Sequence, residues 1–111
     1  MKTLIVINNE SFGKGDDELG KRLMGAYLKK LWVRDEMPDT IVCYNSGAKL
    51  VAKGSMVLDA LNGLYEKGVD ILACGTCLNH YHLADQVKVG RSTDMGEIVE
   101  LMMTYDKVIT V

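Results

Sequence analysis

The stretch VDILACGTCLNHYH, residues 69–82, holds the change of pattern that decides the fold. Its first five residues are mostly apolar and partly β-branched, which is typical of a strand covered on both faces of a sheet. A Cys-x-x-Cys pair follows, and then a segment that contains both histidines of the chain. Runs like the first one recur three times, as TLIVI (3–7), TIVCY (40–44) and KVITV (107–111).

Stretches with helical spacing of apolar residues separate these runs. The expected helices are, in chain order, residues 16–31, 55–68, 78–87 and 94–105. Acidic residues at 16–18 suit a helix start, where negative charge is favoured. Ser55 is the expected N-cap of the second helix and Gly68 its C-terminal stop. Asp94 and Glu97 form a capping-box-like pair at the start of the last helix.

Strand and helix therefore alternate along the chain, which predicts an α/β fold. We expect three layers, α/β/α, around a mainly parallel sheet of four to five strands. A short strand near residues 87–89 would be the fifth. The chain shows no internal repeat, linker or low-complexity tract, so residues 1–111 are expected to form a single domain.

Composition narrows the classes of function. The net charge is −2, from 13 basic and 15 acidic residues that are well mixed, so no basic stripe is present to bind nucleic acid. No apolar segment is long enough to cross a bilayer, and the first apolar run is too short for a signal peptide. A cytoplasmic location is expected, with no membrane partner. Three cysteines argue against a secreted disulfide framework.

Polar residues follow three of the expected strands. Because open α/β sheets bind ligands beyond the carboxyl ends of their strands, these residues are the expected ligand-binding edge. The three segments are Asn8-Asn9-Glu10, Asn45-Ser46-Gly47 and Cys74-Gly75-Thr76-Cys77.

Cys77 is the candidate nucleophile of this edge. It is placed near the start of a helix, where unpaired backbone N–H groups and the helix dipole lower the pKa of a thiol. Cys74 ends the preceding strand, and both thiols could instead be small buried apolar residues. Cys43 lies inside a strand run, so a core position is expected for it.

Three specific functions of the CGTC segment can be compared: dithiol exchange, zinc binding and haem attachment. Thioredoxin-type exchange would place the pair after an early strand with a later cis-proline, but no proline follows Pro38. A zinc site on Cys74, Cys77, His80 and His82 would have a spacing far tighter than closed structural sites use, so no metal is expected. A c-type haem needs histidine directly after the second cysteine, where Leu78 stands.

A partial match to the nucleotide-binding P-loop does not indicate a nucleotide site. GDDELGKR, residues 15–22, has Arg22 where a P-loop has serine or threonine, and its carboxylates would repel phosphates.

Three segments together resemble the DsrE-like domain of the selenium metabolism protein YedF family, within the DsrE/DsrF sulfurtransferase-like superfamily. They are INNESFGKGDDELGKRLMGAYL, PDTIVCYNSGAKLVAKGS and GVDILACGTCLNHYHLADQVKVGRSTDMGEIVELM. The resemblance implies a DsrE-like fold and a sulfur or selenium relay that uses a cysteine persulfide. It also implies sulfur donor and acceptor proteins as partners, and homo-oligomers such as trimers or hexamers. The TusA-like domain that usually precedes this one in YedF-type proteins is absent from residues 1–111.

The resemblance places the persulfide in the CGTC loop, and the helix argument selects Cys77 over Cys74 as its carrier. Asn8, Asn9, Asn45 and Ser46 would line the pocket, beside the Gly75-Thr76 turn, and Cys74 would resolve the persulfide. No cofactor is expected. The alternative is a non-catalytic module with the same fold that binds a small ligand or a partner, or senses redox state.

Overall fold

In a computed structural model that describes residues 1–111, five strands form one parallel sheet in the order β4-β3-β2-β1-β5. The strands are β1 (Thr3–Ile7), β2 (Thr40–Cys43), β3 (Asp70–Cys74), β4 (Arg91–Thr93) and β5 (Lys107–Thr110). The expected α/β class and parallel sheet are confirmed. The chain steps outward from β1 to β4 and then returns to the other side of β1.

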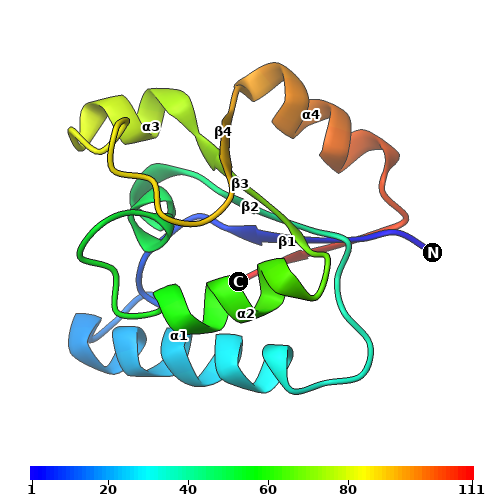
Figure 1. The fold of residues 1–111 in the computed structure, drawn as a ribbon, viewed down its shortest axis with the longest axis horizontal. Helices are drawn as coiled ribbons and strands as arrows, with labels where there is room; N and C mark the ends of the chain where they lie inside the picture. Colours follow the sequence, from blue (N-terminus) through cyan, green and yellow to red (C-terminus); the bar gives the residue numbers. More distant parts are fainter.

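Helices cover both faces of this sheet (Figure 1). Connections that run in opposite directions along a parallel sheet place their right-handed crossovers on opposite faces. Accordingly, α1 (Asp17–Trp32) and α2 (Leu58–Glu66) lie on one face, and α4 (Met95–Thr104), which leads back to β5, lies on the other (Figure 1). The short helix α3 (Gly75–His80) and the 3-10 helix η1 (Asn45–Val51) lie beyond the carboxyl ends of the strands.

The strand residues divide alternately between two apolar cores. Ile5, Ile41 and Ile71 belong to a cluster of 18 buried residues shared with α1 and α2. Their chain neighbours Val42 and Leu72 belong to a cluster of six shared with α4. Successive side chains of a strand point to opposite faces, so strands covered on both faces read as continuous apolar runs. Cys43 is fully buried in the larger cluster, as expected.

Two of the expected helix starts are capped by aspartate. The Asp16 carboxylate accepts a hydrogen bond from the Leu19 N–H at the start of α1, at 2.9 Å. The Asp94 carboxylate accepts one from the Glu97 N–H at the start of α4, at 2.8 Å. Each cap satisfies a backbone donor that has no partner inside the helix.

Three boundaries differ from the sequence prediction. Ser55 does not cap α2, whose N-cap is Val57; the Ser55 hydroxyl instead accepts from the Val57 N–H within a turn. The third helix covers 75–80 and not 78–87, because the chain turns at Tyr81 and His82 takes a positive φ of 59°.

The fifth strand is also displaced from its expected position. It lies at 91–93, whereas Val87 forms only an isolated antiparallel bridge with Ala52. None of the helices combines the length and the apolar character needed to cross a membrane.

Candidate functional site

Gly47 brings η1 directly onto the carboxyl end of β1. A Cβ atom at this position would lie 2.3 Å from the Ile7 carbonyl oxygen, closer than any real Cβ contact. The Tyr44 N–H also donates to the Ile7 carbonyl oxygen, at 3.1 Å. The absence of a side chain at Gly47 therefore sets where the two residues before it, Asn45 and Ser46, lie.

Cys77 lies in the first turn of α3, which begins directly after β3. The backbone N–H of Asn45 donates to the Cys77 Sγ atom at 3.1 Å. Asn45 has a positive φ of 52°, a conformation that asparagine tolerates better than most residues. Cys77 is partly buried against both cores, and the neighbouring Cys74 is almost fully buried. Both thiols are free.

The pKa of Cys77 is raised, contrary to the expected depression. Burial of the thiol is the largest cause, and the Cys74 thiol beside it adds to the rise. The Asn45 N–H opposes the rise because it stabilises the thiolate. The helix start does not depress the pKa of Cys77 because α3 has only six residues, and the partial burial of the thiol outweighs the backbone N–H groups that stabilise the thiolate. Cys77 is therefore a weaker acid than an unperturbed cysteine.

Asn9 and Ser46 join the loop after β1 to η1. The Asn9 side-chain oxygen accepts from the Ser11 N–H at 2.8 Å and from the Ser46 hydroxyl at 3.3 Å. The Ser46 hydroxyl also accepts from the Glu10 N–H at 3.1 Å. The ends of β1 and β2 are thus tied together, and Asn45 links them to Cys77.

Other residues of the expected site are less directly involved. The side chains of Asn8 and Thr76 are exposed and make no hydrogen bond within the chain. Gly75 starts α3 close to the end of β4, where a Cβ atom would lie 3.3 Å from the Thr93 carbonyl oxygen. His80 and His82 are exposed. No group of three or more His, Cys, Asp or Glu side chains is arranged to hold a metal ion.

Tyr81 and Lys49 belong to this region but were not predicted. The Tyr81 hydroxyl donates to the Asn45 side-chain oxygen at 3.3 Å. The Lys49 ammonium lies 4.5 Å from the centre of the Tyr81 ring, within range of a cation–π contact. Tyr81 could have been suspected from the sequence, because it lies between the two histidines, four residues after Cys77.

The fold and this edge define a class: a three-layer α/β protein with two neighbouring thiols where the third strand meets a helix. The chain belongs to the DsrE/DsrF-like family, whose model matches residues 1–111. No curated protein matches the sequence.

Solved structures share the fold at low sequence identity. The MTH1491 protein of unknown function from Methanobacterium thermoautotrophicum is similar with a TM-score of 0.72 and 19% identity, over 99% of this chain and 98% of that one. The ychN protein from E. coli has a TM-score of 0.69 and 18% identity, over 99% and 98%. The BT1422 protein of unknown function from Bacteroides thetaiotaomicron has 0.69 and 16%, over 99% and 95%.

Proposed function

We propose that the protein is a sulfur relay protein that carries sulfane sulfur as a persulfide on Cys77. The observation that supports this most directly is the Asn45 backbone N–H aimed at the Cys77 Sγ atom. A backbone N–H fixed in this way stabilises negative charge on sulfur, whether on a thiolate or on a persulfide. Membership of the DsrE/DsrF-like family suggests the same kind of function.

The proposed transfer conserves atoms and electrons. The Cys77 thiolate attacks the outer sulfur of a donor persulfide, an S–S bond to Cys77 forms, and the donor leaves as a thiolate. An acceptor thiolate then attacks the same outer sulfur and releases Cys77 as a thiolate. Because the pKa of Cys77 is raised, the attacking thiol must first lose its proton to solvent, and the donor thiolate takes up a proton after it leaves.

Cys74 is the proposed resolving residue. Its thiolate would attack the inner sulfur of the Cys77 persulfide, so that hydrosulfide leaves and a disulfide between Cys74 and Cys77 forms. This branch competes with transfer to an acceptor. Cys74 can attack the Cys77 persulfide because the two thiols are neighbours, whereas Cys43 is fully buried and cannot.

The cargo and partners belong to the proposal as well. The GDDELG, YNSG and CGTC segments favour a YedF-type protein, so selenium is the alternative cargo. Donor and acceptor proteins would approach the exposed rim around Thr76 and Asn8.

Self-association is proposed through α4. Met95, Val99 and Met103 follow one another at helical spacing and are 58%, 51% and 79% exposed. A second copy of the chain, in a trimer or hexamer, would cover this row. Sedimentation of Val99→Lys against wild type tests this idea, and an unchanged mass of wild-type monomer at all concentrations would contradict it.

The intact mass after anaerobic incubation with glutathione persulfide tests the relay. We expect wild type to gain one sulfur atom that mild reduction removes, and Cys77→Ala to gain none. Cys74→Ala should hold the added sulfur longer, because resolution is blocked. Cys43→Ala is the matched control and should behave as wild type. An equal gain in Cys77→Ala would rule out Cys77 as the carrier.

The two neighbouring free thiols, Cys74 and Cys77, favour a second candidate, a redox-sensing or binding module without transfer. It predicts loss of two hydrogens on mild oxidation, as the Cys74–Cys77 disulfide forms, and no gain of sulfur from the donor.

A further inference from the structure

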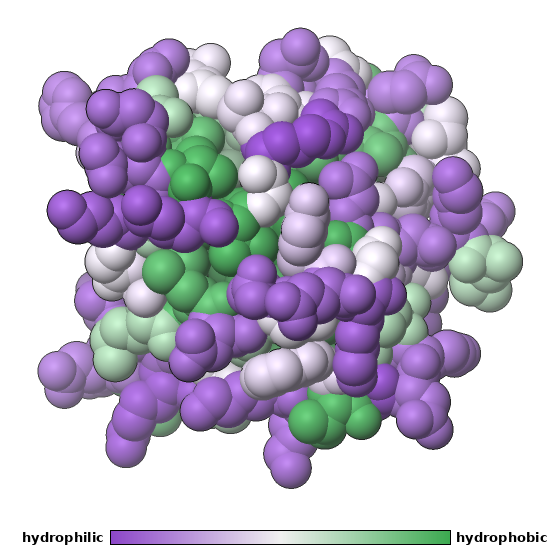
Figure 2. Space-filling view, viewed as in Figure 1, coloured by the Kyte–Doolittle hydropathy of each residue, from purple (hydrophilic) through white to green (hydrophobic).

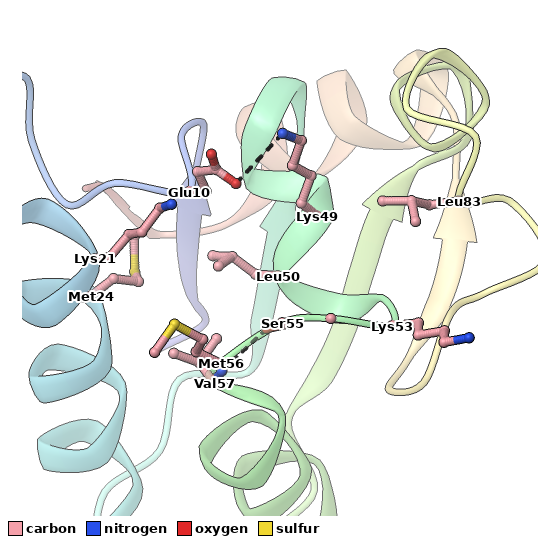
Figure 3. A pocket seen from close by; sticks show the side chains of 11 residues that line it. Glu10, Lys21, Met24, Lys49, Leu50, Lys53, Ser55, Met56, Val57 and Leu83 are labelled. Atoms are coloured by element: carbon pink, nitrogen blue, oxygen red, sulfur yellow. Dashed lines mark hydrogen bonds and ion pairs between the residues drawn. The ribbon is translucent and has the colours of Figure 1, made fainter. Parts of the chain in front are cut away.

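A cavity separate from the thiols lies between α1, η1 and the segment 53–57 (Figure 3). Its volume is about 220 Å³. Met24, Leu50 and Val57 form its apolar floor, and these side chains are only 1%, 7% and 8% exposed. Figure 2 shows apolar surface in this region, between α3 and α1, surrounded by hydrophilic side chains.

The walls of this cavity are held by the fold. Met24, Leu50 and Val57 all belong to the larger core, so they cannot move without disturbing it. The loop that closes one side is fixed by hydrogen bonds from the Lys53 N–H to the Gln86 carbonyl oxygen and from the Val57 N–H to the Ser55 hydroxyl. The cavity is therefore formed before any ligand arrives, which lowers the entropic cost of binding.

The rim of the cavity carries excess positive charge. Lys21 and Lys49 both line it, and in Figure 3 their amino groups lie on the side of Glu10. The only carboxylate of the lining belongs to Glu10, whose Oε2 atom is 3.8 Å from the Lys49 Nζ atom. The Lys49 and Glu10 side chains are 38% and 31% exposed, so their charges are screened only in part. Lys53 also lines the cavity, so the single carboxylate of Glu10 cannot neutralise the three lysines.

We propose that this cavity binds a small organic anion, namely a carboxylate with a short aliphatic chain. The chain would lie on the floor of Met24, Leu50 and Val57, and the carboxylate would lie between the Lys21 and Lys49 ammonium groups. This pairing of an apolar floor with cations at the rim favours an anion over neutral and cationic ligands of the same shape. The site does not depend on Cys77 or on sulfur transfer.

Methionine methyl groups report on this cavity directly. Met24 and Met56 line it, whereas Met95 and Met103 lie on α4, on the other face of the sheet, and serve as internal controls. Protein labelled with ¹³C in its methionine methyl groups is titrated by NMR with hexanoate, hexan-1-ol and hexylamine, at constant ionic strength.

We expect hexanoate to move the Met24 and Met56 signals in a saturable way and to leave those of Met95 and Met103 in place. Hexan-1-ol should bind more weakly, and hexylamine more weakly still. No shift with hexanoate, or equal binding of hexylamine, would overturn the proposal.

Removing a positive or a negative charge at the rim should change the affinity for hexanoate in opposite directions. Lys49→Met keeps the aliphatic stem, removes the ammonium, and should weaken hexanoate binding about two- to fivefold. Glu10→Gln should strengthen it by a similar factor, because the competing carboxylate is gone. Lys30→Met, on exposed α1 surface outside the cavity, is the matched control and should change nothing. Binding that is unchanged in both Lys49→Met and Glu10→Gln, or a Glu10→Gln variant that binds more weakly, would refute the assignment.

Discussion

Substituting Gly47 by alanine tests how η1 is held against β1. The new Cβ atom would lie 2.3 Å from the Ile7 carbonyl oxygen and must retreat to at least 3.0 Å, so η1 has to move by about 0.7 Å. The Ile7 oxygen is backbone and the new Cβ atom is fixed to its own backbone, so no flexible side chain can absorb the shift. Overpacking of this kind costs about 1–3 kcal/mol, of which about 0.4–1 kcal/mol is returned because alanine restricts the unfolded chain. We expect a net loss of about 1–2 kcal/mol, or about 5–10 °C in the melting temperature.

The same shift should reach the thiol. Moving η1 away from β1 displaces the Asn45 N–H, which lies 3.1 Å from the Cys77 Sγ atom. Without this donor the thiolate is less stable, so the pKa of Cys77 rises further. Alkylation of Cys77 by iodoacetamide, followed by intact mass at fixed pH below that pKa, should therefore be slower in Gly47→Ala.

Gly25→Ala is the matched control for this experiment. Gly25 is also in a helix, but an added Cβ atom would meet nothing closer than the Val57 Cγ1 atom at 4.0 Å. It should be neutral or stabilising by up to about 1 kcal/mol. If Gly47→Ala has the melting temperature of wild type and Cys77 is alkylated at an unchanged rate, the contact between Gly47 and the Ile7 carbonyl oxygen does not position the site.

Three further predictions concern single groups. Burial raises the pKa of Cys43 to about 12, so the stability contributed by its neutral thiol is present below the unfolded pKa and falls as pH rises toward 12. Between about pH 8 and 10.5, wild type should lose about 2 kcal/mol more than Cys43→Ala in urea unfolding, and parallel pH profiles would contradict this. Arg91, with Thr93, holds the pKa of Glu97 at about 2, so the stability from this carboxylate is lost as pH falls from 4.5 toward 2. Glu97→Gln should therefore be less sensitive to acid than wild type in the same assay, and an unchanged acid profile would argue against the pair. Asp94→Ala removes the α4 cap and should cost about 1 kcal/mol in thermal unfolding, whereas Asp94→Asn should cost much less; equal losses would show that the cap does not matter.

Much of the fold could be predicted because its determinants are local. The apolar runs at 3–7, 40–44, 69–73 and 107–111 all contain strands. The first three are buried on both faces and are therefore mostly apolar, whereas β5 at the sheet edge is largely exposed. Asp16 and Asp94 marked helix starts through a bond to a backbone N–H three residues on. The strand at 91–93 escaped prediction because Arg91 and Ser92 are polar at the edge of the sheet, where one side has no neighbouring strand.

The position of the candidate site in the fold could be predicted from the sequence, but the acidity of its thiol could not. The chain order of strands places Asn45 and Cys77 at the same edge, because parallel strands end on the same side. The raised pKa of Cys77 depends instead on how deeply the thiol is buried and on its distance from Cys74, and neither can be read from spacing.

The sequence by itself determined most of the strands and helices, and that the CGTC segment lies at the carboxyl end of β3. Only the tertiary structure decided that the Asn45 N–H donates to the Cys77 sulfur at that edge, and that Lys21 and Lys49 line a separate apolar cavity. The physical reason is that strand and helix formation depend on neighbours a few residues away. A contact between η1 and α3, or between α1 and η1, depends on close packing of elements far apart in the chain.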